Sequence, residues 1–210
     1  AGATAEAPGG EAETTMLQPG AVLLRGWARA AAAEWVAQVA AITEKAPFRV
    51  MLRPGGAPLS VAMTNCGKLG WVSNRKGYRY DLIDPDGGKP WPAMPPLFRQ
   101  LALEAAATAG FPGFAPDACL INRYAPGTRL SLHQDRDEGD FSHPIVSIAL
   151  GVSATFLWGG LARGDKTLRY PLYHGDVVVW GGPSRLRFHG IAPLKAGNHP
   201  LTGDVRFNLT

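Results

Sequence analysis

The chain has 210 residues, which is enough for one domain with a substantial hydrophobic core. Its 26 glycines and 18 prolines argue against a helix bundle, because both residues disfavour helix interiors, and they are typical of short strands joined by turns. With 46% hydrophobic residues, 18% charged residues and a net charge of +4, the composition excludes global disorder and permits a polyanionic partner such as nucleic acid.

The first 20 residues are small, polar and interrupted by glycine and proline, which predicts a flexible tail before a single domain over residues 21–210. The tail lacks the features of a signal or transit peptide, and no apolar run approaches the ~20 residues of a membrane span. Cys66 and Cys119 lie outside any CxxC motif, which excludes a disulfide scaffold and is typical of a reducing compartment. We therefore expect a cytoplasmic monomer without membrane association.

Two strands and two helices are predicted before residue 110. Apolar residues recur at helical spacing in the alanine-rich segment 30–45, and they alternate with small or polar residues in the segment 58–65. A polar and aromatic stretch then leads into a DPDGGKP turn. The predicted elements are strands at 21–27 and 58–65 and helices at 30–45 and 95–109.

The chain after Asp117 consists of short runs rich in β-forming residues, nearly all separated by glycine, proline or aspartate. Such runs after two helices predict an α+β, mostly β fold, namely a sandwich or jelly roll with helices packed outside one sheet. The chain has no GxGxxG motif and no P-loop, which disfavours a nucleotide-cofactor enzyme. The predicted strands are 118–124, 145–151, 154–158, 168–173, 176–180, 185–191 and 201–210.

His133 and Asp135 form the first candidate metal-binding pair. In an extended segment, side chains at i and i+2 point the same way, so an imidazole nitrogen and a carboxylate oxygen converge on one point. Fe(II) takes this mixture of ligands when a second histidine completes a facial triad. His189 is the best third ligand, ahead of His143 and His199, because a jelly roll can return a late strand beside His133.

A second His-x-Asp sequence, at His174 and Asp176, has a structural interpretation. Gly175 and Asp176 are typical of the turn that begins the strand after them. We therefore do not expect a metal at this motif.

Two further pairs of polar residues interrupt apolar strands. Asn122 and Tyr124 share one face of their strand, as do Arg206 and Asn208. Burying arginine or asparagine without partners costs several kcal/mol, so the pairs are expected to face a shared polar cavity. Arginine is the natural bidentate partner of a carboxylate, and with the metal ligands it predicts a site for a chelating dicarboxylate.

The order and spacing of these residues resemble the AlkB family of Fe(II)/2-oxoglutarate-dependent dioxygenases. The resemblance covers residues 120–210 and extends upstream through PLSVAMTNCGKLGW and KPWPAMP. The family's closing motif is RxNxTxR, whereas this sequence ends at Thr210, and we expect the natural chain to continue. The residues that carry the resemblance are Asn122, Tyr124, Gly127, His133, Asp135, His189, Arg206, Asn208 and Thr210.

The resemblance implies a jelly roll, or double-stranded β-helix, that binds Fe(II) through His133, Asp135 and His189 and uses 2-oxoglutarate and O2. It also implies that Arg206 pairs with the distal carboxylate of 2-oxoglutarate, while Asn122, Tyr124 and Asn208 surround the cosubstrate. The implied reaction is oxidative demethylation of 1-methyladenine and 3-methylcytosine, with loss of formaldehyde. The implied role is direct-reversal repair of alkylated single- or double-stranded DNA, with RNA as a second candidate polymer.

Substrate contacts are implied by the same resemblance. The family's base-stacking and phosphate-contacting positions are matched by Trp71, Tyr78 and Tyr80. Arg163 matches a further position that contacts the substrate. Asp137 lies two residues beyond a metal ligand, where its carboxylate would favour a cationic methylated base.

The resemblance also implies an N-terminal nucleotide-recognition lid at about residues 50–92 and a jelly-roll core at about 117–210. The loop RPGGAPLS within the lid carries Arg53 but no aromatic residue, which leaves the breadth of substrates open. Two other functions remain as alternatives. One is an Fe(II)/2-oxoglutarate oxygenase of a small molecule or protein side chain, and the other is a jelly-roll binding module without catalysis.

Overall fold

The computed structural model describes residues 13–210, and most of its strands form two antiparallel sheets. The larger sheet has the order β1-β2-β11-β8-β13-β6-β3, and the smaller has the order β10-β9-β12-β7. Bounds in the larger sheet are β1 Thr14–Gln18, β2 Ala21–Leu24, β3 Ala62–Gly67, β6 Ala118–Tyr124, β8 Ile145–Gly151, β11 Val177–Trp180 and β13 Arg206–Leu209. Those in the smaller are β7 Leu130–His133, β9 Ala154–Trp158, β10 Leu168–Leu172 and β12 His189–Ile191.

The larger sheet is buried on both faces. In β11, Val177 and Val179 pack into one hydrophobic cluster, while Val178 and Trp180 pack into another. The first cluster lies between this sheet and the helices, and the second lies between the two sheets. A strand between two apolar layers has no polar face, so its residues form a continuous apolar run.

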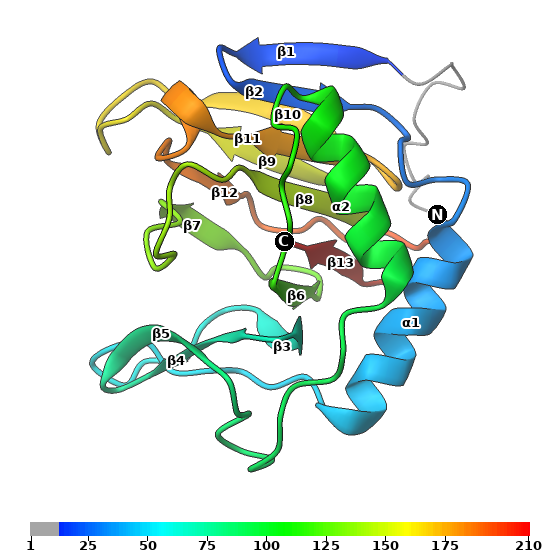
Figure 1. The fold of residues 1–210 in the computed structure, drawn as a ribbon, viewed down its shortest axis with the longest axis vertical. Coiled ribbons are helices and arrows are strands. Elements are labelled where there is room, and N and C mark those ends of the chain that lie inside the picture. The colour runs from blue at the N-terminus through cyan, green and yellow to red at the C-terminus, as the bar shows by residue number, and fades with distance from the viewer. Residues whose placement is uncertain (1–12) are drawn as a thin grey trace.

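The helices α1 (Ala32–Lys45) and α2 (Pro96–Thr108) both pack on the outer face of the larger sheet, as the sequence predicts (Figure 1). The buried side of α1 consists of Trp35, Val39 and Ile42 with Ala32. The Trp35 ring stacks on Phe98 of α2 at a centroid distance of 4.3 Å. Gly110 follows α2 with φ = +90°, a conformation that ends helices and favours glycine.

A two-stranded hairpin projects from this body at the end opposite β1 (Figure 1). It consists of β4 (Gly70–Asn74) and β5 (Gly77–Asp81), which the sequence did not predict because their polar and aromatic residues do not alternate clearly. Gly70 allows Trp91 to pack against the hairpin, since a Cβ at this position would lie 2.3 Å from the indole ring.

Several predicted boundaries are wrong. Residues 14–18 were expected in a flexible tail but form β1, which pairs with β2; the tail's residues 1–12 lie outside the described part of the chain. The segment 185–191 is strand only from His189, because a 3-10 helix at Gly182–Ser184 leads directly into Arg185. The segment 201–210 is strand only from Arg206, since it begins with turns.

The expected lid, residues 50–92, contains two kinds of structure. Its β3 belongs to the larger sheet, where it pairs with β6. The hairpin β4–β5 and the loop at residues 53–57 lie outside both sheets. The nucleotide-recognition lid expected at residues 50–92 stays a prediction, and the segments outside both sheets that could form it are the hairpin β4–β5 and the loop at residues 53–57.

Candidate active site

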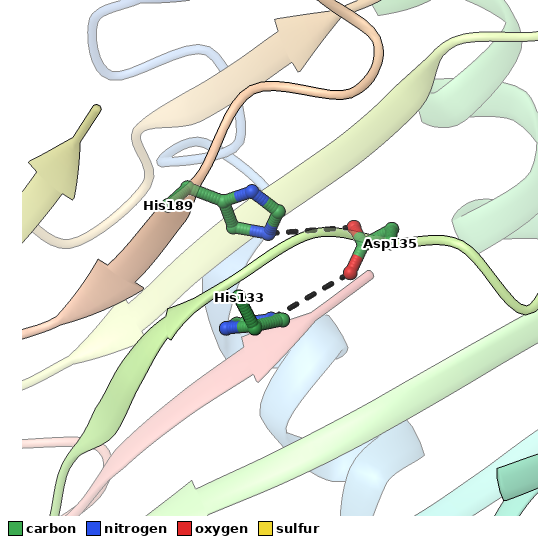
Figure 2. A group of neighbouring side chains, drawn as sticks. All are labelled: His133, Asp135 and His189. Carbon is green, nitrogen blue, oxygen red and sulfur yellow. Dashed lines mark ion pairs between the residues drawn. The ribbon is translucent and has the colours of Figure 1, made fainter. Parts of the chain in front are cut away.

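Strand pairing brings the two histidines of the predicted metal site together. In the antiparallel pair β7–β12, His133 and His189 are direct partners, although they lie 56 positions apart in the chain. The close approach depends on Gly190, because a Cβ there would lie 2.5 Å from the Leu130 carbonyl oxygen. Asp135 follows β7 in the adjoining loop, and all three side chains point toward one another (Figure 2).

The ligand atoms of this triad lie within 4.8 Å of one another. Asp135 Oδ1 is 3.6 Å from His133 Nε2, and its Oδ2 is 3.4 Å from His189 Nε2. The Nδ1 atom of His133 lies 2.8 Å from the Ser131 carbonyl oxygen, and that of His189 lies 3.0 Å from the Arg187 carbonyl oxygen. Because a carbonyl only accepts, Nδ1 carries a proton in each ring, which leaves each Nε2 as the atom that would bind a metal beside Asp135.

The electrostatics of the triad keep the carboxylate charged. Burial opposes ionisation of Asp135, but the two histidines and Arg185 outweigh it and hold the pKa of that carboxyl well below its usual range. Burial and the neighbouring His189 lower the pKa of His133. Burial also lowers the pKa of His189, but the Asp135 carboxylate outweighs it, so the net shift is upward.

This donor set fits a divalent metal. Both Nε2 atoms and the Asp135 carboxylate converge on one point, and Asp135 Oδ2 is buried without a geometrically defined hydrogen-bond donor among the described residues. Two histidines with one carboxylate are the facial set of non-haem Fe(II), so a cation between them would bind all three. Within residues 13–210 this is the one cluster of three or more potential ligands that could hold a metal ion.

The second pair of predicted polar groups also meets across a sheet. In the antiparallel pair β6–β13, Arg206 lies opposite Tyr124, and Asn208 lies opposite Asn122. The Asn122 amide donates to Asn208 Oδ1 at 3.3 Å, which joins the two strands through their side chains. All four side chains are buried and line the cavity that contains the triad of His133, Asp135 and His189.

Several buried polar atoms on this side of the cavity have no hydrogen-bond partner in the described part of the chain. Arg206 is 0% exposed, yet none of its three guanidinium nitrogen atoms has a hydrogen-bond partner among the described residues. The Tyr124 hydroxyl and Asn122 Oδ1 are likewise buried and unpartnered there. An unpaired buried guanidinium is costly, so the Arg206 and Tyr124 donors fit a carboxylate-bearing ligand such as 2-oxoglutarate.

The predicted substrate residues line the same cavity, whose volume is about 1590 Å3. Trp71 and Tyr78 stack on each other at 5.5 Å with an interplanar angle of 17°. Trp71 Nε1 donates to Asp137 at 2.7 Å, and the Tyr80 hydroxyl donates to Glu138 at 2.7 Å. Tyr80 therefore bonds to a loop carboxylate, a contact that the sequence did not predict.

Arg163 also lines this cavity, beside the strand that carries His133. Its Nη1 donates to the Leu132 carbonyl oxygen at 3.1 Å, and its guanidinium lies 4.8 Å from the Phe188 ring centroid. The predicted metal, cosubstrate and substrate residues are thus all brought to one cavity, although their individual roles remain predictions.

Comparison with known proteins agrees with this geometry. Residues 20–210 match the 2OG-Fe(II) oxygenase superfamily. The chain is 59% identical over 194 residues to the alpha-ketoglutarate-dependent dioxygenase AlkB of Escherichia coli K12, a match that covers 92% of this chain and 90% of the relative. The chain belongs to the AlkB family. It is an Fe(II)- and 2-oxoglutarate-dependent dioxygenase, and its cavity holds the donor sets that both cofactors need.

More distant AlkB relatives share the fold. The solved structure of OsALKBH1 superimposes with a TM-score of 0.83 at 28% identity and covers 94% of this chain and 98% of that chain. The mouse nucleic acid dioxygenase ALKBH1 is 34% identical over 126 residues, which is 59% of this chain and 32% of the relative. The predicted jelly roll is therefore confirmed. Within residues 13–210, no helix is long and apolar enough to cross a membrane.

Three residues around the AlkB site were missed by sequence analysis. Arg185 and Glu138 bond to each other beside the triad, where Arg185 also donates to the Asp135 carbonyl oxygen, and the Trp180 ring lies 4.7 Å from the His189 ring. Glu138 lies in an acidic stretch typical of a solvated loop, and Arg185 lies in a segment predicted as strand. A charged residue in a predicted strand was the one available signal for Arg185, and Arg187 in the same segment carries the same signal.

The second His-x-Asp sequence is structural, as predicted. Gly175 has φ = +86°, and the buried Asp176 carboxylate accepts from the backbone N–H groups of Gly26 and Tyr173. His174 Nδ1 accepts from the Gly151 N–H at 2.9 Å, and its ring stacks on His199 at 4.0 Å. These residues support turns, away from the iron ligands.

We expect His174 to make the protein less stable in mild acid. Burial, with His199 and Arg29 adding to it, lowers the pKa of His174 to about 4. The unfolded chain therefore binds a proton at this residue below pH ~6.5, whereas the folded chain resists it down to about pH 4. Stability from this residue is present above pH ~6.5 and falls as the pH drops through that window.

Thermal unfolding at pH 7 and pH 4.5 tests this expectation. The decrease in Tm should be smaller in His174→Asn, whose side-chain oxygen can still accept from Gly151 but does not titrate. Equal decreases in the two proteins would show that His174 does not contribute to acid sensitivity.

Proposed function

We propose that this AlkB-family enzyme oxidatively demethylates N-alkylated bases, with 1-methyladenine and 3-methylcytosine as preferred substrates, in DNA and also in RNA. With iron, 2-oxoglutarate and O2 bound, the site supplies the oxidation of an N-methyl carbon, which leaves as formaldehyde while 2-oxoglutarate becomes succinate and CO2. The restored base remains in the chain, so the proposed role is direct-reversal repair. Two relatives support a nucleic-acid substrate by name, the mouse nucleic acid dioxygenase ALKBH1 and the fission yeast tRNA demethylase abh1.

One observation carries this proposal. The cavity that contains the iron ligands is also lined by a stacked aromatic pair, Trp71 and Tyr78, and by an adjacent carboxylate, Asp137. Its volume of about 1590 Å3 exceeds the ~300–1,000 Å3 of ordinary small-molecule pockets, and so suits a nucleotide beside 2-oxoglutarate. Enzymes that act on a base remove it from the stack and hold it between aromatic side chains.

The residues of this chain then have separate proposed tasks. His133, Asp135 and His189 hold the metal, while Arg206 and its neighbours orient 2-oxoglutarate. The Trp71 ring is fixed by its hydrogen bond to Asp137, and Tyr78, 45% exposed, completes the stacking surface. Arginines that also line the cavity would contact phosphates, which position a nucleic acid without reading its sequence. They are Arg53, Arg129, Arg136 and Arg163.

Formaldehyde release tests the proposed function. The enzyme with Fe(II), ascorbate and 2-oxoglutarate should release formaldehyde from single-stranded oligonucleotides that carry 1-methyladenine or 3-methylcytosine. An unmethylated oligonucleotide of the same sequence is the control. Free methylated nucleosides test the alternative of a small-molecule oxygenase, since turnover of nucleosides at the rate of oligonucleotides would contradict a polymer substrate.

Asp137 should select cationic bases. In Asp137→Asn the side-chain oxygen can still accept from Trp71 Nε1, so the substitution removes the charge while keeping the ring in place. Asp137 is exposed, so we expect a charge effect of about 1 kcal/mol, or about fivefold to tenfold in kcat/KM. The decrease should be seen with 1-methyladenine and be smaller with neutral 1-methylguanine.

The ratio of kcat/KM for these two bases is the measurement that matters, because it cancels general damage to the site. Asp140→Asn is the matched control, since Asp140 lies on the same loop and pairs instead with His143 at 3.6 Å. If Asp137→Asn slows both bases equally, the carboxylate supports the Trp71 ring rather than choosing the substrate.

A cytoplasmic location and a monomeric state belong to the same proposal. Cys66 and Cys119 are both free and buried, which suits a reducing compartment. Gel filtration with light scattering tests the monomer, and a mass near twice that of the chain would contradict it.

A further inference from the structure

Arg185 holds the loop that follows the first iron ligand. It is 3% exposed, and each of its three guanidinium nitrogen atoms donates a hydrogen bond to this loop. Nη1 donates to the Asp135 carbonyl oxygen at 2.8 Å, Nη2 to the Glu138 carboxylate at 3.1 Å, and Nε to the His143 carbonyl oxygen at 3.0 Å. One side chain thus contacts the beginning, the middle and the end of residues 135–143, which we call the ligand loop.

The ligand loop is also attached to the hairpin β4–β5. Glu138 uses its second oxygen, Oε1, to accept the Tyr80 hydroxyl at 2.7 Å, while Oε2 accepts from Arg185. Burial first, and then the Glu138 carboxylate, raise the pKa of Tyr80, so its hydroxyl stays protonated as the donor. A continuous chain of hydrogen bonds therefore runs from β5 through Glu138 and Arg185 to the backbone of an iron ligand.

We propose that Arg185 is a positioning residue that fixes Asp135 for iron and, through Glu138, couples the placement of the β4–β5 hairpin to the iron site. The hairpin contributes the aromatic pair of the proposed nucleotide site, so this coupling rests on the proposed function. A nucleic acid that seats the hairpin would then tighten the loop that carries Asp135, and oxidation would be favoured when substrate is present.

The geometry explains why this position needs arginine. A guanidinium presents donors in a planar fork, and here the fork reaches two backbone carbonyls and one carboxylate in different directions. Lysine keeps the charge but has a single donor atom, which cannot hold all three acceptors. Arg185→Lys therefore removes the planar arrangement of donors while it keeps the positive charge.

The first test measures iron binding and loop mobility. Fe(II) affinity is measured anaerobically at saturating 2-oxoglutarate from the charge-transfer absorbance, and amide hydrogen exchange of residues 134–143 is measured in the metal-free protein. In Arg185→Lys we expect Fe(II) affinity to fall about tenfold or more, as for other residues that orient metal ligands, and the loop amides to exchange faster. Wild-type affinity together with wild-type exchange would overturn the assignment.

Arg25→Lys is the matched control. Arg25 is a partly buried arginine that also bonds to a backbone carbonyl and a carboxylate: it donates to the Pro171 carbonyl oxygen at 2.7 Å and pairs with Asp176 at 2.6 Å. Both lysine variants should lower Tm, but Arg25→Lys should bind Fe(II) as the wild type does. A similar loss of iron affinity in both would show that Arg185 acts only through general stability and would overturn its role as a positioning residue.

The second test addresses coupling to the hairpin. Tyr80→Phe removes only the hydroxyl, so Fe(II) affinity should stay within about twofold, while KM for a methylated oligonucleotide rises about threefold to tenfold. The ratio of formaldehyde to succinate should fall, since cosubstrate oxidation is then less tied to substrate. An unchanged KM and an unchanged ratio would overturn the coupling.

Combining the substitutions completes the design. If Tyr80 and Arg185 act through one chain of hydrogen bonds, the double variant Arg185→Lys with Tyr80→Phe should have no higher KM than Arg185→Lys alone. Additive effects on KM would contradict the shared route.

Should the wild type release no formaldehyde from any methylated oligonucleotide, the proposed function fails. The iron-affinity and exchange measurements would still decide the role of Arg185.

Discussion

His189→Ala should abolish oxidation while leaving the chain folded. The substitution removes one of two imidazole ligands and leaves Asp135 and His133, a pair too weak to hold Fe(II) in a facial geometry. We expect turnover at background level and no charge-transfer band when Fe(II) and 2-oxoglutarate are added anaerobically. Thermal unfolding should remain cooperative, because both sheets keep their other apolar contacts.

His143→Ala is the control for this experiment. The sequence left His143 as an alternative prediction for the third metal ligand. In the structure it instead pairs with Asp140 at 3.6 Å, and 54% of its side chain is exposed. His143→Ala should therefore keep wild-type iron binding. Retained turnover in His189→Ala, or its loss in His143→Ala, would overturn the triad assigned here.

Arg206→Met should raise the 2-oxoglutarate requirement about tenfold to a hundredfold. A charge-assisted hydrogen bond contributes roughly 1.5–3 kcal/mol, and methionine has similar length without the charge. Fe(II) affinity without cosubstrate should be unchanged, because Arg206 lies on β13 of the larger sheet and the iron histidines lie on the smaller one. Titration of the charge-transfer band with 2-oxoglutarate measures the effect.

Stability without cosubstrate gives a second readout for Arg206→Met. The wild type carries a fully buried guanidinium without a hydrogen-bond partner in the described chain, so removing that charge should leave Tm unchanged or raise it. The increase in Tm that 2-oxoglutarate gives the wild type should then be largely lost. A normal ligand-induced increase in the variant would place the distal carboxylate elsewhere.

Local patterns were sufficient for much of the fold. Both helices lie within two residues of their predicted ends, and the strands 118–124, 145–151 and 154–158 agree with β6, β8 and β9. These segments have strong periodicity or β-propensity and end at glycine or proline, so neighbouring residues decide their structure. The same holds for the His133 and Asp135 pair, whose spacing alone makes its ligands converge.

The errors have two different causes. Residues 14–18 form β1 in a local hairpin with β2 across Pro19 and Gly20, so the error there is a missed turn signal. The segment 185–188 has strand-like composition, but the Arg185 side chain bonds to a loop about 50 positions away. The partner of Arg185 is not visible in the local sequence, because propensity is a weak prior that tertiary contacts override.

Residue types and their spacing were therefore enough to identify the chemistry of this protein: the metal ligands, the buried arginine and the resemblance to AlkB. Which of these groups meet depends on the tertiary structure. It paired His133 with His189 and Arg206 with Tyr124 by strand register, and it joined Tyr80 to Arg185 through Glu138. Register follows from closing two sheets around a shared core, and loop contacts follow from that closure, so neither can be obtained from residue type and spacing alone.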